Sequence, residues 1–193
     1  MLYRRIEFQA GEYYHIYHRG QDRQKIFFED ENYLYFLTLL RKYREKFEMN
    51  VIAYCLMPNH FHFLLQPKTS NNLSRFVGLL EQSYAQAINK RYHRHGSLFH
   101  NERFQHAHVY SDRYQILCCR YIHANPSKDK LVADLRDWPF SNYLDFIEVR
   151  KGELVVAGYR ERFFPTAKEY EDFVAKYGTD ENDDLEKFLF GVK

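Results

Sequence analysis

Two histidines, His60 and His62, lie two positions apart in the segment HFHFLLQ. On a β-strand, side chains two positions apart point to the same face, so both imidazoles would emerge together while the phenylalanines beside them point to the core. Two imidazoles at this separation can share one divalent cation. The same spacing is typical of ordinary polar residues on a solvated sheet face, and a second such pair, His106 and His108, occurs in QHAHV.

A tyrosine and an amide that could complete such a site occur in the segment RYIHANP. Tyr121 and Asn125 are four positions apart, which places them on one face of a helix. The phenol could attack a phosphate and the amide oxygen could bind the cation, since imidazoles with an amide oxygen suit Mn²⁺ or Mg²⁺. No cluster of carboxylates accompanies them, which argues against a two-metal hydrolytic nuclease. With 17 tyrosines in the chain, Tyr121 taken alone is equally typical of a core residue.

The elements that must position these residues follow from hydrophobic periodicity and turn signals. Strands are expected over 12–19, 49–57, 60–67 and 97–110, and helices from about 30 to 48 and over 70–96. A third long helix is expected to be capped by Asp112 and to stop at Pro126, because the residue before proline is pushed out of the α region. Two short amphipathic helices, TAKEYEDFVAKYG and DDLEKFLFG, follow. The order β-α-β-β-α-β predicts an α+β fold of the ferredoxin-like type, a split β-α-β antiparallel sheet with helices on one face and the other face open to a ligand.

Composition is that of a globular protein, with 193 residues that are 45% hydrophobic and 28% charged. Residues 168–187 hold 8 acidic and 3 basic side chains, which leaves the rest of the chain with a charge of +7. This basic body suits a polyanionic partner, although a solvated basic surface explains it equally well. The chain has no run of 18 apolar residues, no signal-peptide pattern and no disulfide framework, so we expect a cytoplasmic protein that does not enter a membrane.

Six segments of the chain, taken together, resemble the REP-associated tyrosine transposases, relatives of the single-tyrosine transposases in the HUH (His-hydrophobic-His) superfamily. In chain order they are YHIYHRGQDRQKIF, AYCLMPNHFHFLLQP, YAQAINKRY, GSLFHNERF, RYIHANPSK and WPFSNY. They span about residues 13–146, in the order and spacing of that family. The resemblance implies a transposase domain over 1–146 and a C-terminal helical extension over 147–193, packed on the same domain.

Within that family the two histidines of the strand hold the metal, which implies His60 and His62, and the tyrosine of the late helix is the nucleophile, which implies Tyr121. The resemblance makes Asn125 the third ligand, although related transposases more often have glutamine there. The implied reaction is Mg²⁺- or Mn²⁺-dependent cleavage of single-stranded DNA at a REP-type hairpin, followed by strand transfer through a 5′-phosphotyrosine intermediate. Candidate phosphate contacts, which as ordinary solvated charges need no such role, are the arginines in or beside the matching segments: Arg19, Arg23, Arg91, Arg94 and Arg103.

The remaining histidines need no catalytic role, and two other classes of protein fit the sequence less well. His106 and His108 fall outside the shared segments and are interpreted as incidental, or as contacts to the DNA backbone. His123 belongs to the helix motif but points away from the face that carries Tyr121. A non-catalytic or domesticated nucleic-acid-binding module with the same fold would be marked by a lost histidine or tyrosine, and none is lost. A structural zinc protein expects a closed Cys/His site, and no cysteine is suitably spaced from a histidine. Monomeric and dimeric states both stay open.

Overall fold

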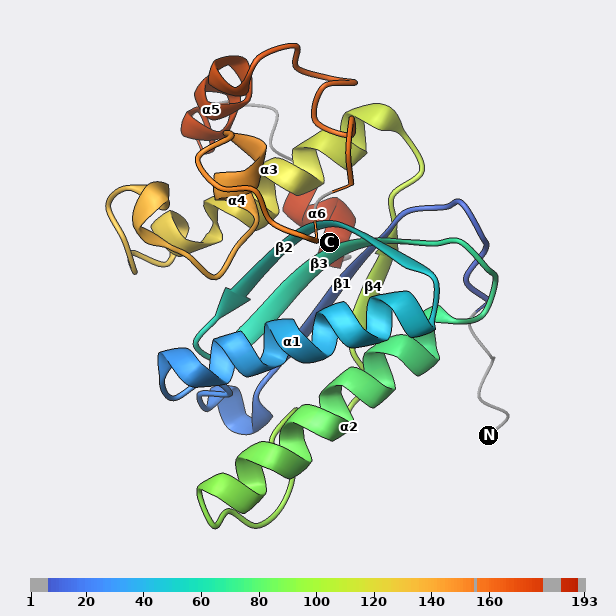
Figure 1. Cartoon of the computed structure of the whole chain (residues 1–193), viewed down its shortest axis with the longest axis vertical. Helices are drawn as coiled ribbons and strands as arrows, with labels where there is room; N and C mark the ends of the chain where they lie inside the picture. The colour runs from blue at the N-terminus through green and yellow to red at the C-terminus, as the bar shows by residue number, and fades with distance from the viewer. Residues whose placement is uncertain (1–6, 155, 179–184, 191–193) are drawn as a thin grey trace.

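A four-stranded antiparallel sheet forms the centre of the computed structural model, which describes residues 7–154, 156–178 and 185–190. The strand order is β2-β3-β1-β4 (Figure 1). The strands are β1 (Tyr14–Arg19), β2 (Met49–Met57), β3 (His60–Pro67) and β4 (Gln105–His108). One helix connects β1 to β2 and another connects β3 to β4, so the predicted ferredoxin-like α+β fold is confirmed.

Helices α1 (Asp30–Lys46) and α2 (Leu73–Arg91) cover one face of the sheet (Figure 1). The period-two alternation of β3 directs Phe61 and Phe63 into the core beneath these helices. Both rings lie against that of Phe36 in α1, at centroid distances of 5.6 and 6.3 Å. The residues that alternate with them along β3, including the two histidines, therefore face the opposite side of the sheet.

Helix α3 (Asp112–Lys128) crosses that opposite face, against β2 and β3 (Figure 1). Ser111, and not Asp112 as predicted, caps its first turn by accepting a hydrogen bond from the backbone N–H of Tyr114. The predicted stop at Pro126 is wrong, because the helix continues to Lys128. A proline in the last turn removes only one helical N–H, and Pro126 and the residues just before it are buried, so packing outweighs the bias against the α region.

In the described part of the chain, α3 is followed by a 3-10 turn, η2 (Leu135–Asp137), and by the short α-helices α4 (Tyr143–Phe146), α5 (Ala167–Ala175) and α6 (Leu185–Phe190). Helix α5 packs on α3, and α6 lies against β4 and α3 (Figure 1). These last two helices fall inside the two amphipathic segments predicted near the end of the chain. The face of the sheet that was predicted to be open to a ligand is thus covered in part by α3 and by the helices that follow it.

The fourth strand is much shorter than the 97–110 predicted, since β4 comprises only four residues. The segment before it hydrogen-bonds to the chain around the end of β1 instead, through Gln21 N–H to the Leu98 carbonyl and His100 N–H to the Arg19 carbonyl, both at 3.0 Å. That segment therefore packs as a loop beside α2. Among the described helices, none is both long and apolar enough to cross a membrane.

Candidate active site

The histidines of β3 and the tyrosine of α3 line one pocket between the sheet and α3, with a volume of about 430 Å³. The ring centroids of Tyr121 and His62 are 5.2 Å apart, and those of His60 and His62 are 5.0 Å apart. Asn125, one turn after Tyr121, lines the same pocket. The four residues that the sequence grouped by chemical type are therefore neighbours in space.

Strand β1 supplies a second set of side chains to this pocket. Because β1 pairs with β3 and places Tyr17 opposite His62, both Tyr17 and Arg19 line the pocket. The turn after β1 adds Arg23, whose backbone has a positive φ of 59°. Lys128, at the end of α3, also lines the pocket. The arginines and the lysine make the pocket suitable for a phosphate.

Each histidine of β3 has a hydrogen-bond partner at its Nδ1 atom. His60 Nδ1 lies 2.7 Å from Asn59 Oδ1, and His62 Nδ1 lies 3.0 Å from Nε2 of His15 in β1. The Asn59 amide also donates from Nδ2 to the Arg23 carbonyl, which identifies Oδ1 as the atom that faces His60. An amide oxygen only accepts, so His60 carries its proton on Nδ1 and its lone pair on Nε2.

All three imidazoles are shifted towards the neutral form. Burial, with a smaller contribution from the charge of Lys128, lowers the pKa of His60 to about 4. Burial also lowers the pKa of His62 well below its ordinary value, and it lowers that of His15 to about 3. Neutral imidazole is the form of histidine that binds a metal, so these side chains are ready to act as ligands at pH 7 without first losing a proton.

The amide of Asn125 fits the role of an oxygen ligand. Its Nδ2 donates to the Tyr121 carbonyl at 2.7 Å, which leaves Oδ1 as the amide atom that can bind a cation. Among the described residues, no three His, Cys, Asp or Glu side chains are grouped to hold a metal ion. A cation here would depend on His60, His62 and the Asn125 oxygen, with further oxygens from substrate or water. This mixed nitrogen and oxygen donor set fits Mg²⁺ or Mn²⁺.

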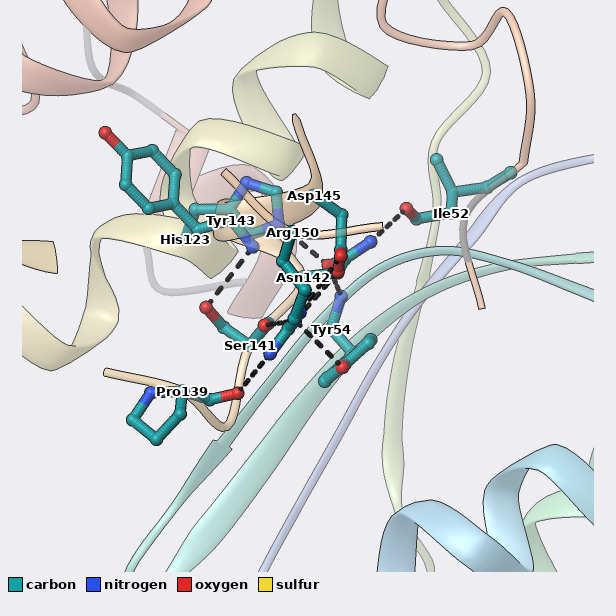
Figure 2. Close-up of polar contacts among 9 residues, drawn as sticks. All are labelled: Ile52, Tyr54, His123, Pro139, Ser141, Asn142, Tyr143, Asp145 and Arg150. Atoms are coloured by element: carbon teal, nitrogen blue, oxygen red, sulfur yellow. Dashed lines mark hydrogen bonds and ion pairs between the residues drawn. The ribbon is translucent and has the colours of Figure 1, made fainter. Parts of the chain in front are cut away.

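A buried asparagine, Asn142, ties α3 to strand β2 of the sheet (Figure 2). Its Oδ1 accepts from the Tyr54 N–H at 2.7 Å, and its Nδ2 donates to the Ile52 carbonyl at 2.9 Å, so β2 fixes the orientation of the amide. The same Oδ1 lies 2.8 Å from Nε2 of His123 in α3. His123 must therefore be the donor at Nε2, and its Nδ1 accepts from the Tyr170 hydroxyl of α5 at 2.7 Å.

Arg150 secures the segment that carries Asn142 (Figure 2). Its guanidinium binds both carboxylate oxygens of Asp145, at 3.0 and 2.7 Å, and donates to the backbone carbonyls of Pro139 and Ser141. Because His123 and Tyr121 belong to the same helix, this network helps to fix the position of the phenol over the histidines. His123 does point away from the face of Tyr121, as the sequence predicted.

The five candidate arginines divide into two groups. Arg19 and Arg23 line the pocket with Tyr121. Arg91, the last residue of α2, pairs with Glu29, and Arg94, just after α2, donates to Gln24. Arg103 lines a different cavity, beside α2. The structure therefore groups only the first two with the histidines.

Among the residues in and beside the pocket that the sequence did not predict, three contact His62 or Tyr121. His15 contacts His62, Lys128 places its Nζ 5.1 Å from the centroid of the Tyr121 ring, and the ring of Phe190 in α6 lies 5.9 Å from that of Tyr121. A signal existed for His15, because the alternation of β1 places it on the same face as Tyr17. The position of Phe190 had no such signal, since an amphipathic pattern does not say what a helix covers.

Comparisons with known proteins identify the family and the fold of the chain. The family model described as "Transposase IS200 like" matches residues 9–125. A Haemophilus influenzae protein that carries the name REP-associated tyrosine transposase is 25% identical over 152 residues, which are 73% of this chain and 84% of that protein. A solved structure of a REP-associated tyrosine transposase bound to a REP hairpin aligns with a TM-score of 0.64 and 18% identity, covering 82% of this chain and 92% of that one. This last likeness shows the same fold.

Proposed function

The chain belongs to the family of IS200-like transposases, and from that premise we propose that it cleaves single-stranded DNA and joins strands through a tyrosine–DNA ester. The resemblance to the REP-associated tyrosine transposases is confirmed by the family match, the curated relative and the fold. The observation that carries the proposed chemistry is the convergence of Tyr121 with His60 and His62 in one pocket. A phenol beside two neutral imidazoles suits covalent attack on a phosphate near a cation.

In the proposed reaction the hydroxyl oxygen of Tyr121 attacks the scissile phosphorus. A new P–O bond forms to the tyrosine, the bond from phosphorus to the 3′ oxygen breaks, and a 3′-hydroxyl leaves. The phenolic proton passes to water, and the leaving 3′ oxygen takes a proton from water. The product is a 5′-phosphotyrosine ester, which another 3′-hydroxyl can attack to join strands and release Tyr121. The ester keeps the energy of the broken bond, which hydrolysis would lose.

The side chains around Tyr121 have complementary roles in this proposal. His60, His62 and Asn125 would hold a Mg²⁺ or Mn²⁺ ion, whose charge would offset the negative charge that develops on the phosphate. The ammonium of Lys128, 5.1 Å from the centroid of the Tyr121 ring, supplies positive charge beside the proposed nucleophile. Arg19 and Arg23 supply positive charge at the same pocket for the phosphates on either side of the cleaved bond.

The proposed substrate is single-stranded DNA beside a REP-type hairpin, and the proposed place of action is the cytoplasm. Support comes from the solved relative, which is a complex with a REP hairpin, and from the basic body of the chain. Because a single chain brings Tyr121 together with His60 and His62, we propose that a monomer can carry out the reaction. We further propose that residues 147–193 act as an extension of the transposase domain, because α5 and α6 both pack on α3.

Cleavage of labelled hairpin oligonucleotides tests the proposal. In the presence of Mn²⁺ the wild-type protein should cleave a single strand beside the hairpin, leaving one fragment with a 3′-hydroxyl and the other attached to protein. Chelation of the metal with EDTA should stop both the cleavage and the attachment of DNA to the protein. A pool of hairpins that is bound and never cleaved would contradict the enzyme and identify a nucleic-acid-binding module.

A further inference from the structure

His15 is a buried histidine whose partner is another buried histidine. Its Nε2 lies 3.0 Å from Nδ1 of His62, and each side chain is 1% exposed. The two rings are nearly parallel, with an interplanar angle of 19°. The rings of Tyr121 and Phe190 pack against His15 at centroid distances of 6.0 and 5.6 Å, so the imidazole is held between apolar surfaces.

One proton must lie between these two nitrogens, and its position decides what His62 can bind. Where His15 is the donor, the neutral His62 carries its own proton on Nε2 and has no lone pair there for a cation. Where His62 donates from Nδ1, its Nε2 keeps the lone pair. Metal-binding histidines almost always donate their second ring N–H to an acceptor, which fixes the tautomer and the orientation of the ring.

The neighbouring histidine already shows this arrangement. The Asn59 amide oxygen accepts from Nδ1 of His60, which leaves the His60 Nε2 lone pair as the site for a ligand. His15 occupies the equivalent position for His62, on the adjacent strand rather than in the adjacent turn. Two different residues from different elements thus meet the Nδ1 atoms of both candidate ligands.

We propose that His15 is a positioning residue, which accepts the Nδ1–H of His62 and so presents the Nε2 lone pair of His62 to a divalent cation. This inference rests on the proposed function, because it assumes that His62 is a metal ligand. His15 touches neither the cation nor the DNA in this account. It acts only through the tautomer and the orientation of His62.

Titration of the full chain with Mn²⁺ in a calorimeter tests this role, with thermal unfolding as the check that each variant is folded. His15→Phe keeps a planar ring but removes the acceptor, and it should weaken Mn²⁺ binding by about 10–100-fold, as loss of such a partner typically does. His15→Gln retains an acceptor oxygen and should stay within about threefold of wild type. His106→Phe, the matched control on β4, should bind Mn²⁺ as wild type does.

The outcomes separate this inference from the proposed site. A folded His15→Phe variant that binds Mn²⁺ as tightly as wild type would overturn the role of His15, and so would a His15→Gln variant as weak as His15→Phe. If His15→Phe does not fold, His15→Met can replace it, because methionine fills the space without a strong acceptor. Wild-type Mn²⁺ affinity in His15→Met, or an equally weak His15→Gln, would then overturn the role of His15. A wild-type protein that binds no Mn²⁺ would instead overturn the metal site itself.

Discussion

The ring of Tyr121 in α3 stands at 89° to the ring of His62 in β3, with their centroids 5.2 Å apart. The two residues belong to different layers of the fold, so their contact depends on how α3 docks on the sheet. Asn142 and His123 provide that docking from the other side of the helix. The proposed chemistry and the stability of this network are therefore linked, and both can be tested.

Loss of one of the proposed histidine ligands should slow cleavage strongly without unfolding the protein. His60 is only partly buried, so His60→Ala is the cleaner choice. The charge of a metal ion contributes several kcal/mol to such a reaction, so we expect the cleavage rate in Mn²⁺ to fall by at least about a hundredfold. His108 is an exposed residue of β4 that pairs with Glu12, and the control variant His108→Ala should cleave DNA at the wild-type rate. Equal rates for His60→Ala and wild type would contradict the assignment.

Removal of a pocket arginine should weaken DNA binding and make it less sensitive to salt. Each phosphate contact to a single strand contributes roughly 0.7 to the slope of log affinity against log salt concentration, so Arg23→Ala should lower that slope by about this amount. Fluorescence anisotropy of a labelled hairpin measures both quantities. Arg41 lies on α1 and forms an exposed ion pair with Glu153, so Arg41→Ala serves as the control and should leave the slope unchanged. An Arg23→Ala variant with an unchanged slope would remove this residue from the DNA interface.

Truncation of Asn142 should destabilise the fold strongly. Asn142→Ala leaves three buried groups without their partner: the Tyr54 N–H, the Ile52 carbonyl and the His123 Nε2–H. Each such group costs about 1–3 kcal/mol, so we expect a loss of at least about 3 kcal/mol in the free energy of unfolding by urea. Asn50→Ala removes only a partly exposed bond to Gln66 and should cost less than about 1 kcal/mol. Similar losses for the two variants would show that the network carries little stability.

His123 should make the protein less stable in mild acid. Burial lowers its pKa to about 4, against an ordinary value of 6.5, so unfolding takes up a proton between these limits. Stability from this group is therefore fully present above about pH 6.5 and is lost as the pH falls towards 4. In His123→Gln, the slope of unfolding free energy against pH over this interval should decrease by about 1.4 kcal/mol per pH unit, which corresponds to one proton. An unchanged slope would mean that His123 titrates normally in the folded protein.

Local patterns were sufficient to predict the central hairpin. Strands β2 and β3 have the predicted bounds, because the turn at Pro58 and Asn59 separates two strongly apolar segments. The face on which His60 and His62 lie also followed from strand alternation. Where tertiary contacts compete with local preference, prediction was wrong, as in the last turn of α3 around Pro126 and in the short β4.

The residues that surround the site could not be predicted from local sequence patterns. The partnership of His15 with His62 needs the pairing of β1 with β3, and that of His123 with Asn142 needs α3 to dock on β2. Helix α6 was predicted from its amphipathic pattern, but its contact with the pocket through Phe190 was not. Such contacts arise from packing between elements distant in sequence, which residue types and spacing do not determine.

The most direct test of the account is to locate the covalent bond between protein and DNA. The wild-type protein, incubated with Mn²⁺ and a labelled hairpin oligonucleotide, should form an adduct that survives a denaturing gel, and mass spectrometry of its peptides should place the nucleotide on Tyr121. Tyr121→Phe should form no adduct. Tyr177→Phe, in which the altered ring lies 6.3 Å from that of Tyr121, should form it as wild type does. An adduct in Tyr121→Phe, or one mapped to another residue of the wild-type chain, would contradict the account.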